Sequence, residues 1–261
     1  MSLHLVLVEP AGSLNVGSVA RLGANFGVAG LRLVAPRCDP FAEEARRMAV
    51  HGLPLLQQAR LYPDLASALA DCRRVVACSG RAEGPPLPLQ DPATALSWLL
   101  ADAASREGGE AVALVFGRED RGLSNDELLQ AGRLLCIATG PAYSSLNLSH
   151  AVAVVLHELH GLQRGFTTAR ELPAALESAQ PQPQPCVRAE LEAALADAQE
   201  LLLEVGFLLP HTARARMAKL RALLQRAEIS SAEVALLRGM VGQLRWAQRR
   251  RAAVGPDAVD A

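Results

Sequence analysis

The stretch Ala-Val-Ala-Leu-Val-Phe-Gly-Arg-Glu-Asp-Arg-Gly-Leu-Ser, residues 111–124, contains the pattern that decides the fold class. Its first six residues are apolar without interruption, and a loop bounded by Gly117 and Gly122 follows at once. A short strand with no polar alternation is typical of a sheet that is covered on both faces. We therefore expect a parallel sheet with a ligand-binding loop at the carboxyl end of this strand.

Similar apolar runs recur along the first two thirds of the chain, at residues 3–8, 31–34, 75–78 and 134–138. Segments with helical spacing of apolar residues lie between them, at 17–26, 41–50, 64–70 and 92–104. Strands that alternate with helices predict an α/β fold, a parallel sheet with helices on both faces.

A tract of alternating proline and glutamine, residues 178–185, separates this part from the rest of the chain. Such a tract is typical of an extended linker. Three helical patterns follow it, at 187–205, 211–227 and 230–251, and Ser230 with Glu233 has the spacing of a capping box. We expect a first domain over 1–165, a linker over 166–186 and a small all-α extension over 187–261.

The charge of the chain is distributed unevenly. Its 261 residues carry a net charge of -1, which by itself argues against a dedicated nucleic-acid-binding protein. Residues 211–251, however, hold ten basic and two acidic side chains. We expect this segment to contact the phosphates of RNA, with a merely solvated helix face as the alternative. The candidate contacts are Arg214, Arg216, Lys219, Arg221, Arg226 and Arg238. Because aromatic residues make up 3% of the chain, we expect little stacking on bases.

Five cysteines without a C-x-x-C pair are expected to be reduced thiols of a cytoplasmic protein. No apolar run reaches membrane-spanning length, and the amino terminus has no signal-peptide pattern, so we expect no membrane association. The histidines of His157-Glu158-Leu159-His160 lack H-E-x-x-H spacing, so no metal site is expected.

Two further loops follow expected strands and could carry chemistry. The first is Glu9-Pro-Ala-Gly-Ser-Leu-Asn15-Val-Gly-Ser-Val-Ala-Arg21, and the second is the Ser-rich segment 137–149. The first lacks the G-x-G-x-x-G of a Rossmann fingerprint, and the 117–124 loop lacks the lysine of a nucleotide-triphosphate P-loop. The small hydroxyl and amide side chains of the 137–149 segment, together with free backbone donors, suit an adenosine-like ligand.

Together the three loops resemble one family. N-x-G-S-x-A-R at 15–21, F-G-x-E-x-x-G-L-S at 116–124 and S-L-N-L-S at 145–149 are similar to the three motifs of SPOUT-superfamily 2′-O-ribose methyltransferases of the SpoU type. Beyond the linker, Gly206-Phe207, residues 219–227 and Leu236-Leu-Arg-Gly239 resemble the extension of TrmJ-type tRNA methyltransferases.

The resemblance implies a carboxyl-terminal trefoil knot in the first domain, S-adenosylmethionine as cofactor, and a homodimer whose active site is completed across the subunit interface. It implies tRNA as substrate, with methylation of the ribose of cytidine or uridine 32 in the anticodon loop. The positions that match the family's catalytic residues are Asn15, Arg21, Glu119, Ser145 and Asn147. Those that match its cofactor-binding residues are Cys78, Ser79, Gly80, Gly117, Ile137, Ser144, Ser145 and Leu146.

Arg21 is the family's activating group, yet an arginine stays protonated at neutral pH and is a poor general base. We expect Arg21 to stabilise the developing alkoxide as a cation, with a phosphate oxygen or water accepting the proton. The alternatives are a ribosomal-RNA 2′-O-methyltransferase, a non-catalytic RNA-binding paralogue of the same fold, and an enzyme acting on a small metabolite. The last leaves the basic helical segment unexplained.

Overall fold

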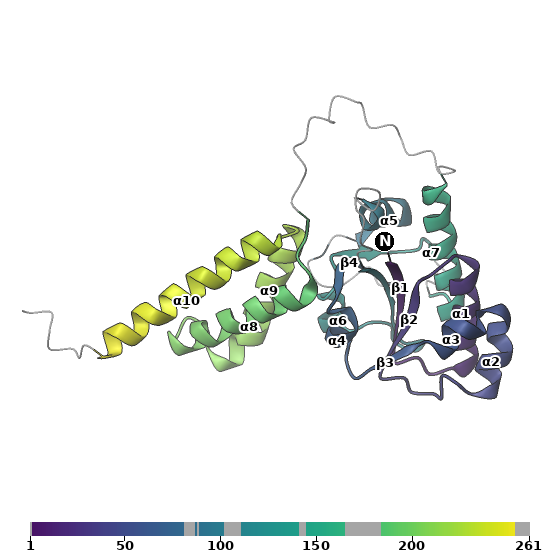
Figure 1. Ribbon diagram of the computed structural model, residues 1–261, viewed down its shortest axis with the longest axis horizontal. Helices are drawn as coiled ribbons and strands as arrows, with labels where there is room; N and C mark the ends of the chain where they lie inside the picture. Colours follow the sequence, from purple (N-terminus) through teal and green to yellow (C-terminus); the bar gives the residue numbers. More distant parts are fainter. Residues whose placement is uncertain are drawn as a thin grey trace, which may run out of the picture. The chain divides into compact units, whose positions relative to one another are not determined.

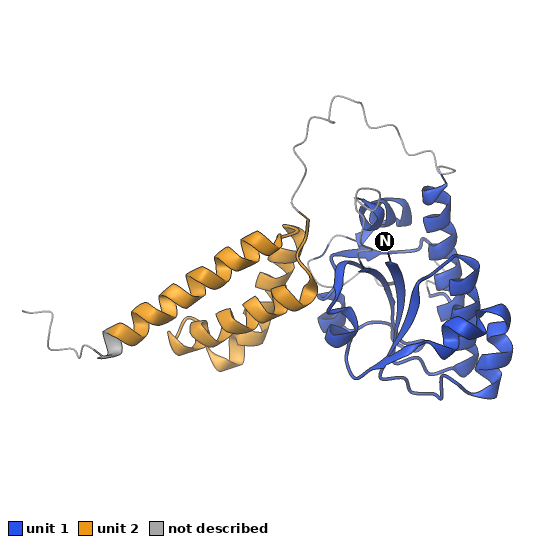
Figure 2. Cartoon of the chain, in the orientation of Figure 1, with its two compact units in different colours: residues 1–182 blue, residues 183–261 orange. Residues whose placement is uncertain are grey.

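A computed structural model describes residues 2–80, 87, 89–101, 111–140, 145–164 and 184–253. The chain forms two units, residues 1–182 and 183–261, which Figure 2 distinguishes by colour. Most of the linker expected at 166–186, and Ser144 among the expected site residues, lie outside the described residues. Each unit has its own hydrophobic core, so each is treated by itself.

The first unit is built on a seven-stranded sheet with the order β3-β2-β1-β6-β4-β7-β5. Every neighbouring pair is parallel, as the apolar runs predict. The bounds of its strands are β1 Ser2–Val8, β2 Gly30–Val34, β3 Arg60–Tyr62, β4 Cys72–Cys78, β5 Leu89–Gln90, β6 Ala111–Phe116 and β7 Arg133–Leu135.

Helices cover both faces of this sheet, with α4 and α6 on the opposite side from α1, α2, α3 and α7 (Figure 1). In β1, Leu5 and Leu7 belong to the core cluster under α1 and α7, whereas the buried Val6 and Val8 point the other way. This alternation of two apolar faces explains the continuous hydrophobic run. The helices are α1 Ser13–Asn25, α2 Glu43–Ala49, the short 3₁₀ helix η1 Val50–Gly52, α3 Leu53–Gln57, α4 Leu65–Leu69, α5 Pro92–Leu100, α6 Asn125–Leu128 and α7 Leu148–Gln163.

The second unit consists of α8 (Arg188–Glu204), α9 (Pro210–Arg226) and α10 (Ser231–Ala253) around a separate core. Three contacts show that α8 and α10 run in the same direction: Glu190 with Ser231, Asp197 with Arg238, and Glu200 with Arg245. The capping box expected at the start of the last helix is confirmed by reciprocal hydrogen bonds between residues 230 and 233.

The expected elements are present, with differences at their ends. Helix α1 begins at Ser13, four residues before the expected start, and β7 ends at Leu135 rather than residue 138. The short strands β3 and β5 and the one-turn helix α6 had no hydrophobic pattern to predict them. No described helix is long and apolar enough to cross a membrane. The trefoil knot stays a prediction.

Candidate functional site

A cavity of about 360 Å³ lies at the carboxyl ends of three neighbouring strands, β6, β4 and β7. Its walls are the segments that directly follow these strands and the loop before α7. Seven of the eight expected cofactor-binding residues line it: Cys78, Ser79, Gly80, Gly117, Ile137, Ser145 and Leu146. The structure therefore brings together, from four separate segments, the residues selected from the sequence.

Backbone packing fixes the shape of this cavity. The amide of Ser79 donates to the carbonyl of Leu135 at 2.9 Å, which holds the chain after β4 against β7. A Cβ atom at Gly117 would lie 2.4 Å from both the carbonyl carbon of Gly122 and the amide nitrogen of Leu123. Only glycine therefore lets the two ends of the 117–122 loop meet.

Hydrogen bonds join the three motif loops beside the cavity. The Glu119 carboxylate accepts from the amides of Ala11 and Gly12 at 3.0 and 3.2 Å, and from Asn15 Nδ2 at 3.1 Å. Asn15 Oδ1 in turn accepts from Asn147 Nδ2 at 3.1 Å. Three of the five expected catalytic residues thus form one continuous chain, Glu119–Asn15–Asn147, which we call the motif bridge.

The motif bridge fixes the ionisation of Glu119. Burial alone would raise the pKa of its carboxyl group, but the hydrogen bonds from Ala11, Asn15 and Gly12 outweigh burial, and the pKa is lowered. Glu119 is therefore a carboxylate at neutral pH with both oxygens engaged. Such a group orients loops rather than exchanging protons, so we assign Glu119 a positioning role.

Asn147 ends the motif bridge at the start of α7. Its Oδ1 accepts from the amide and from the hydroxyl of Ser149, at 2.9 and 2.8 Å, and so caps the helix. The asparagine therefore sets where α7 begins. It also sets where the loop that contains Ser145 and Leu146 leaves the cavity wall.

Arg118 is a cavity residue that the sequence motifs do not single out. Its guanidinium, 8% exposed, makes two hydrogen bonds to Glu127 at 2.8 and 2.9 Å and a third to Glu9. The two carboxylates raise the pKa of Arg118, which lowers the pKa of Glu9 in return. The arginine lines the cavity and ties the end of β1 to the loop after β6 and to α6. The only signal in the sequence was its place between Gly117 and Glu119.

Asp120 and Arg121 also line the cavity, and its other polar side chains are small and uncharged. Ser79, Thr139 and Ser145 supply hydroxyl groups, and burial raises the pKa of the Cys78 thiol to about 12, so this thiol stays neutral. Among the described residues, no group of three or more His, Cys, Asp or Glu could hold a metal ion. The cavity suits an organic ligand with hydrogen-bonding groups and an apolar portion.

Comparison with known proteins gives this cavity its context. A sequence profile of the SpoU rRNA Methylase family matches residues 2–157. The chain belongs to this family. A second profile, for the C-terminal domain of the tRNA methyltransferase TrmJ, matches residues 189–255, so the expected TrmJ-type extension is confirmed.

Relatives of this SpoU-family chain align along nearly its whole length. A Klebsiella pneumoniae protein named tRNA (cytidine/uridine-2′-O-)-methyltransferase TrmJ is 36% identical over 93% of this chain and 96% of its own. The crystal structure of TrmJ from Z. mobilis ZM4 superposes with a TM-score of 0.78 at 31% identity, covering 94% of this chain and all of that one. A probable methylase family protein from Haemophilus influenzae Rd KW20 gives a TM-score of 0.54 at 27% identity, over 95% and 97% of the two chains.

Three of the five expected catalytic residues are absent from the cavity wall: Asn15 and Asn147, which the motif bridge joins to Glu119, and Arg21. Arg21 lies on the exposed side of α1 and is absent from the cavity wall. Within the described part of the chain, its guanidinium has no carboxylate partner. Of the expected catalytic residues, Glu119 and Ser145 line the cavity.

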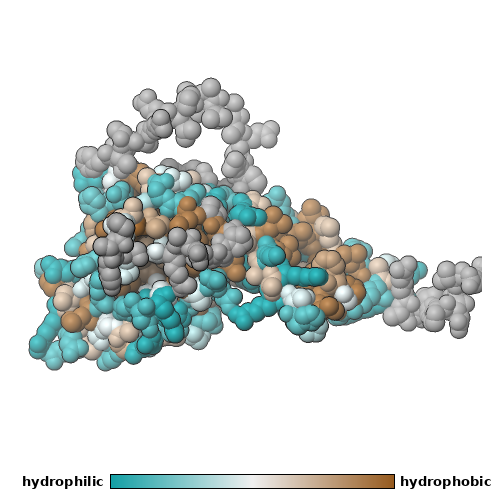
Figure 3. Space-filling model, turned by 180° about the vertical axis from the view of Figure 1, so that it is seen from behind, coloured by the Kyte–Doolittle hydropathy of each residue, from teal (hydrophilic) through white to brown (hydrophobic). Residues whose placement is uncertain are grey.

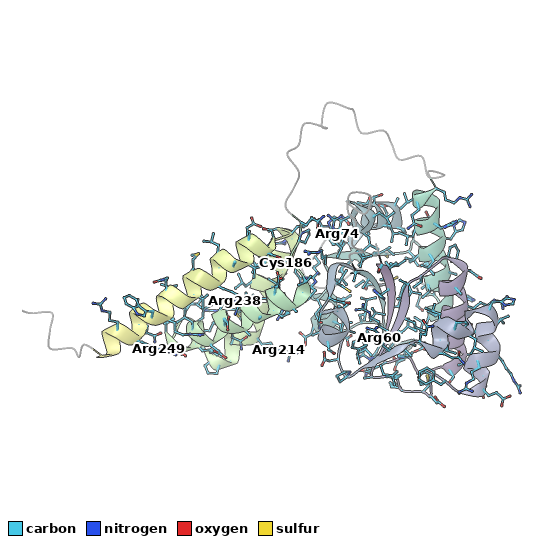
Figure 4. All side chains as sticks on the ribbon, in the orientation of Figure 1. Arg60, Arg74, Cys186, Arg214, Arg238 and Arg249 are labelled. Atoms are coloured by element: carbon cyan, nitrogen blue, oxygen red, sulfur yellow. The ribbon has the colours of Figure 1, made fainter. Side chains whose placement is uncertain are left out.

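The expected RNA contacts lie on α9 and α10, where Figure 4 labels Arg214 and Arg238. Arg221 makes two hydrogen bonds of 2.8 Å to Glu192, and Arg238 pairs with Asp197 at 3.2 Å. These carboxylates belong to α8, which the charge count over 211–251 left out. The basic character of the segment is therefore partly neutralised within the unit. The remaining candidates are Arg214, Arg216, Lys219 and Arg226, all exposed.

Proposed function

We propose that the protein is an S-adenosylmethionine-dependent tRNA 2′-O-ribose methyltransferase. The observation that carries the proposal is the cavity at the ends of β6, β4 and β7, whose wall contains seven residues selected from the family motifs. Its small neutral side chains and its backbone donors fit the adenosine portion of this cofactor. When bound, S-adenosylmethionine supplies the methyl group from its sulfonium.

The separation of Arg21 from the cavity supports a homodimer. We propose that Arg21 acts in the cavity of the partner subunit, as the family resemblance implies. Helices α1 and α7 lie side by side and carry exposed Leu14 and Val154, apolar surface that a second copy would bury. The test mixes two inactive variants, Arg21→Ala and Gly117→Ala. Hybrid dimers regain one intact site if Arg21 acts across the interface, and they stay inactive if it acts in its own subunit.

Arg21 stays cationic and lowers the energy of the forming ribose alkoxide, while a phosphate oxygen or water takes the proton. Arg21→Lys keeps the charge but loses the planar fork. We expect much weaker activity and no new dependence on pH. A variant with nearly full activity, and with a pH profile moved toward the pKa of lysine, would contradict the electrostatic role.

The substrate is tRNA, and we propose ribose 32 of the anticodon loop, as cytidine or uridine, in the cytoplasm. The TrmJ-type C-terminal unit supports tRNA rather than ribosomal RNA. Incubation with labelled S-adenosylmethionine and either total tRNA or ribosomal RNA, followed by mapping of the 2′-O-methyl group, tests this. Label only in ribosomal RNA would favour the other substrate, and cofactor binding without transfer to either RNA would favour a non-catalytic paralogue.

A further inference from the structure

Two aromatic rings of the C-terminal unit are exposed, and each lies against an arginine. Phe207 is 62% exposed, with the Arg216 guanidinium carbon 5.7 Å from its ring centre. Trp246 is 57% exposed, with that of Arg250 at 5.2 Å. Figure 3 shows hydrophobic side chains at the surface of this unit. Exposed large apolar side chains that gather on one small unit mark an interaction surface.

Both pairs belong to the same end of the unit. Helices α8 and α10 are parallel, and Glu200 near the end of α8 contacts Arg245, the residue before Trp246. Phe207 lies in the turn that follows α8, and Arg216 reaches this turn from α9. The turn and the last described turns of α10 therefore lie at a similar level along the bundle.

The turn that carries Phe207 is held by hydrogen bonds and by packing against the core. Gly206, with φ of +75°, reverses the chain after α8, and the amide of Leu208 donates to the carbonyl of Leu202 at 2.9 Å. The buried Leu208 anchors the turn in the core, which leaves its neighbour Phe207 facing solvent. Arg216 Nη1 donates to the Phe207 carbonyl at 2.8 Å. A side chain on a preformed turn loses less entropy on binding than one on a segment that must first fold.

The two arginines at these rings differ from other arginines of the unit in their charge partners. Among the described residues, neither Arg216 nor Arg250 has a carboxylate partner, in contrast to Arg238 and Arg245, which pair with carboxylates of α8. Arg249, three residues beyond Trp246, is also exposed. Within the described part of the chain, this end thus combines aromatic faces with arginines that have no carboxylate partner.

We propose that Phe207 with Arg216 and Trp246 with Arg250 form a platform on which unpaired nucleobases of the RNA stack. Aromatic rings and arginine planes stack on bases of any sequence, and the positive charge attracts the flanking phosphates. A protein partner without an excess of acidic residues would cover the apolar surface but would not neutralise the positive charge. The proposal rests on an RNA substrate and assigns its loop nucleotides a binding site outside the cavity. It revises the expectation from composition that stacking contributes little.

The test compares binding of an unmodified tRNA transcript to the full-length protein and to Phe207→Ala and Trp246→Ala. We expect the Kd to rise at least about fivefold for each variant. Its dependence on salt concentration stays unchanged, because stacking releases no counterions. Phe207→Tyr and Trp246→Phe keep a ring and retain affinity. Leu236→Ala removes an apolar side chain of α10 that is 66% exposed and serves as the matched control.

Lys219→Ala should give a different result: the Kd for the transcript depends less on salt concentration, because one phosphate contact is lost. The platform is refuted if the alanine variants bind the transcript as tightly as Leu236→Ala. It is equally refuted if they change only the oligomeric state measured by light scattering. Binding is recorded without methyl transfer, so inactivity toward every RNA would refute the proposed function and leave this test intact.

Discussion

Replacement of Arg118 by methionine tests the electrostatic account of the cavity wall. The substitution keeps most of the side-chain volume and removes the charge between Glu9 and Glu127. Loss of one partner from a fully buried ion pair costs about 3 to 5 kcal/mol. Because Glu127 and Glu9 keep 15% and 27% of their side-chain surface in water, we discount this to about 2 to 3 kcal/mol. Arg118→Lys keeps the charge but lacks the planar guanidinium that bonds both carboxylates, so we expect an intermediate loss of stability.

The measurement is urea unfolding followed by tryptophan fluorescence. The chain has two tryptophans, Trp98 in the first unit and Trp246 in the second, so Trp246→Phe in every variant makes the signal specific for the first unit. The midpoint should fall with an unchanged slope against urea. A loss below about 0.5 kcal/mol for Arg118→Met, within the range of ordinary surface changes, would refute the reasoning.

The dependence on pH gives a second check. Arg118 lowers the pKa of both Glu9 and Glu127 in the folded state. A lowered carboxyl pKa stabilises the fold above the ordinary pKa, and this stability is lost as the pH falls through the folded value. The difference between the parent and Arg118→Met should therefore be full at pH 7 and should shrink on acidification below about pH 4.5. A difference that stays constant to low pH would exclude the carboxylates as its cause.

Three further substitutions follow from the first unit. Gly117→Ala puts a Cβ atom against the backbone of Gly122, so the affinity for the cofactor, measured by calorimetry, should fall more than about tenfold. Binding as tight as that of the parent would contradict the steric argument. Glu119→Gln breaks at least one of the hydrogen bonds that Glu119 accepts from Ala11, Gly12 and Asn15. We expect kcat/KM to fall about tenfold with a small change in Tm, and unchanged kinetics would mean that these hydrogen bonds are dispensable. Asp71→Asn leaves the buried Arg32 without its charged partner, so the free energy of unfolding in urea should fall by about 2 kcal/mol. A change near zero would show that the ion pair does not stabilise the fold.

The sequence predicted the cavity because its residues follow strands directly. Cys78, Gly117 and Ile137 each come next to a continuous apolar run, and parallel strands end at one edge of the sheet. Their assignment as cofactor-binding residues came from the family resemblance, and their meeting in one wall also requires β6, β4 and β7 to be neighbours in the sheet. The short edge strand β5, two residues long, has no such pattern and owes its pairing to β7.

Contacts between distant segments could not be predicted in this way. Arg118 and Glu9 are 109 residues apart, and their meeting depends on β1 and β6 being neighbours in the sheet. Likewise, the pairing of Arg238 with Asp197 depends on the register between two helices that separate hydrophobic patterns do not fix. The charge of the C-terminal segment was overestimated for this reason.

The motif bridge also has a thermodynamic consequence. Because Glu119, Asn15 and Asn147 join the loop after β6, the start of α1 and the start of α7, an occupant that orders one of these segments restrains the other two. A cofactor in the cavity and an RNA against α1 would then each reduce the entropy that the other loses on binding. By linkage, each ligand must strengthen the affinity of the other by the same factor. Cooperative binding of the cofactor and the RNA would thus require only that three loops become more ordered, without a larger conformational change.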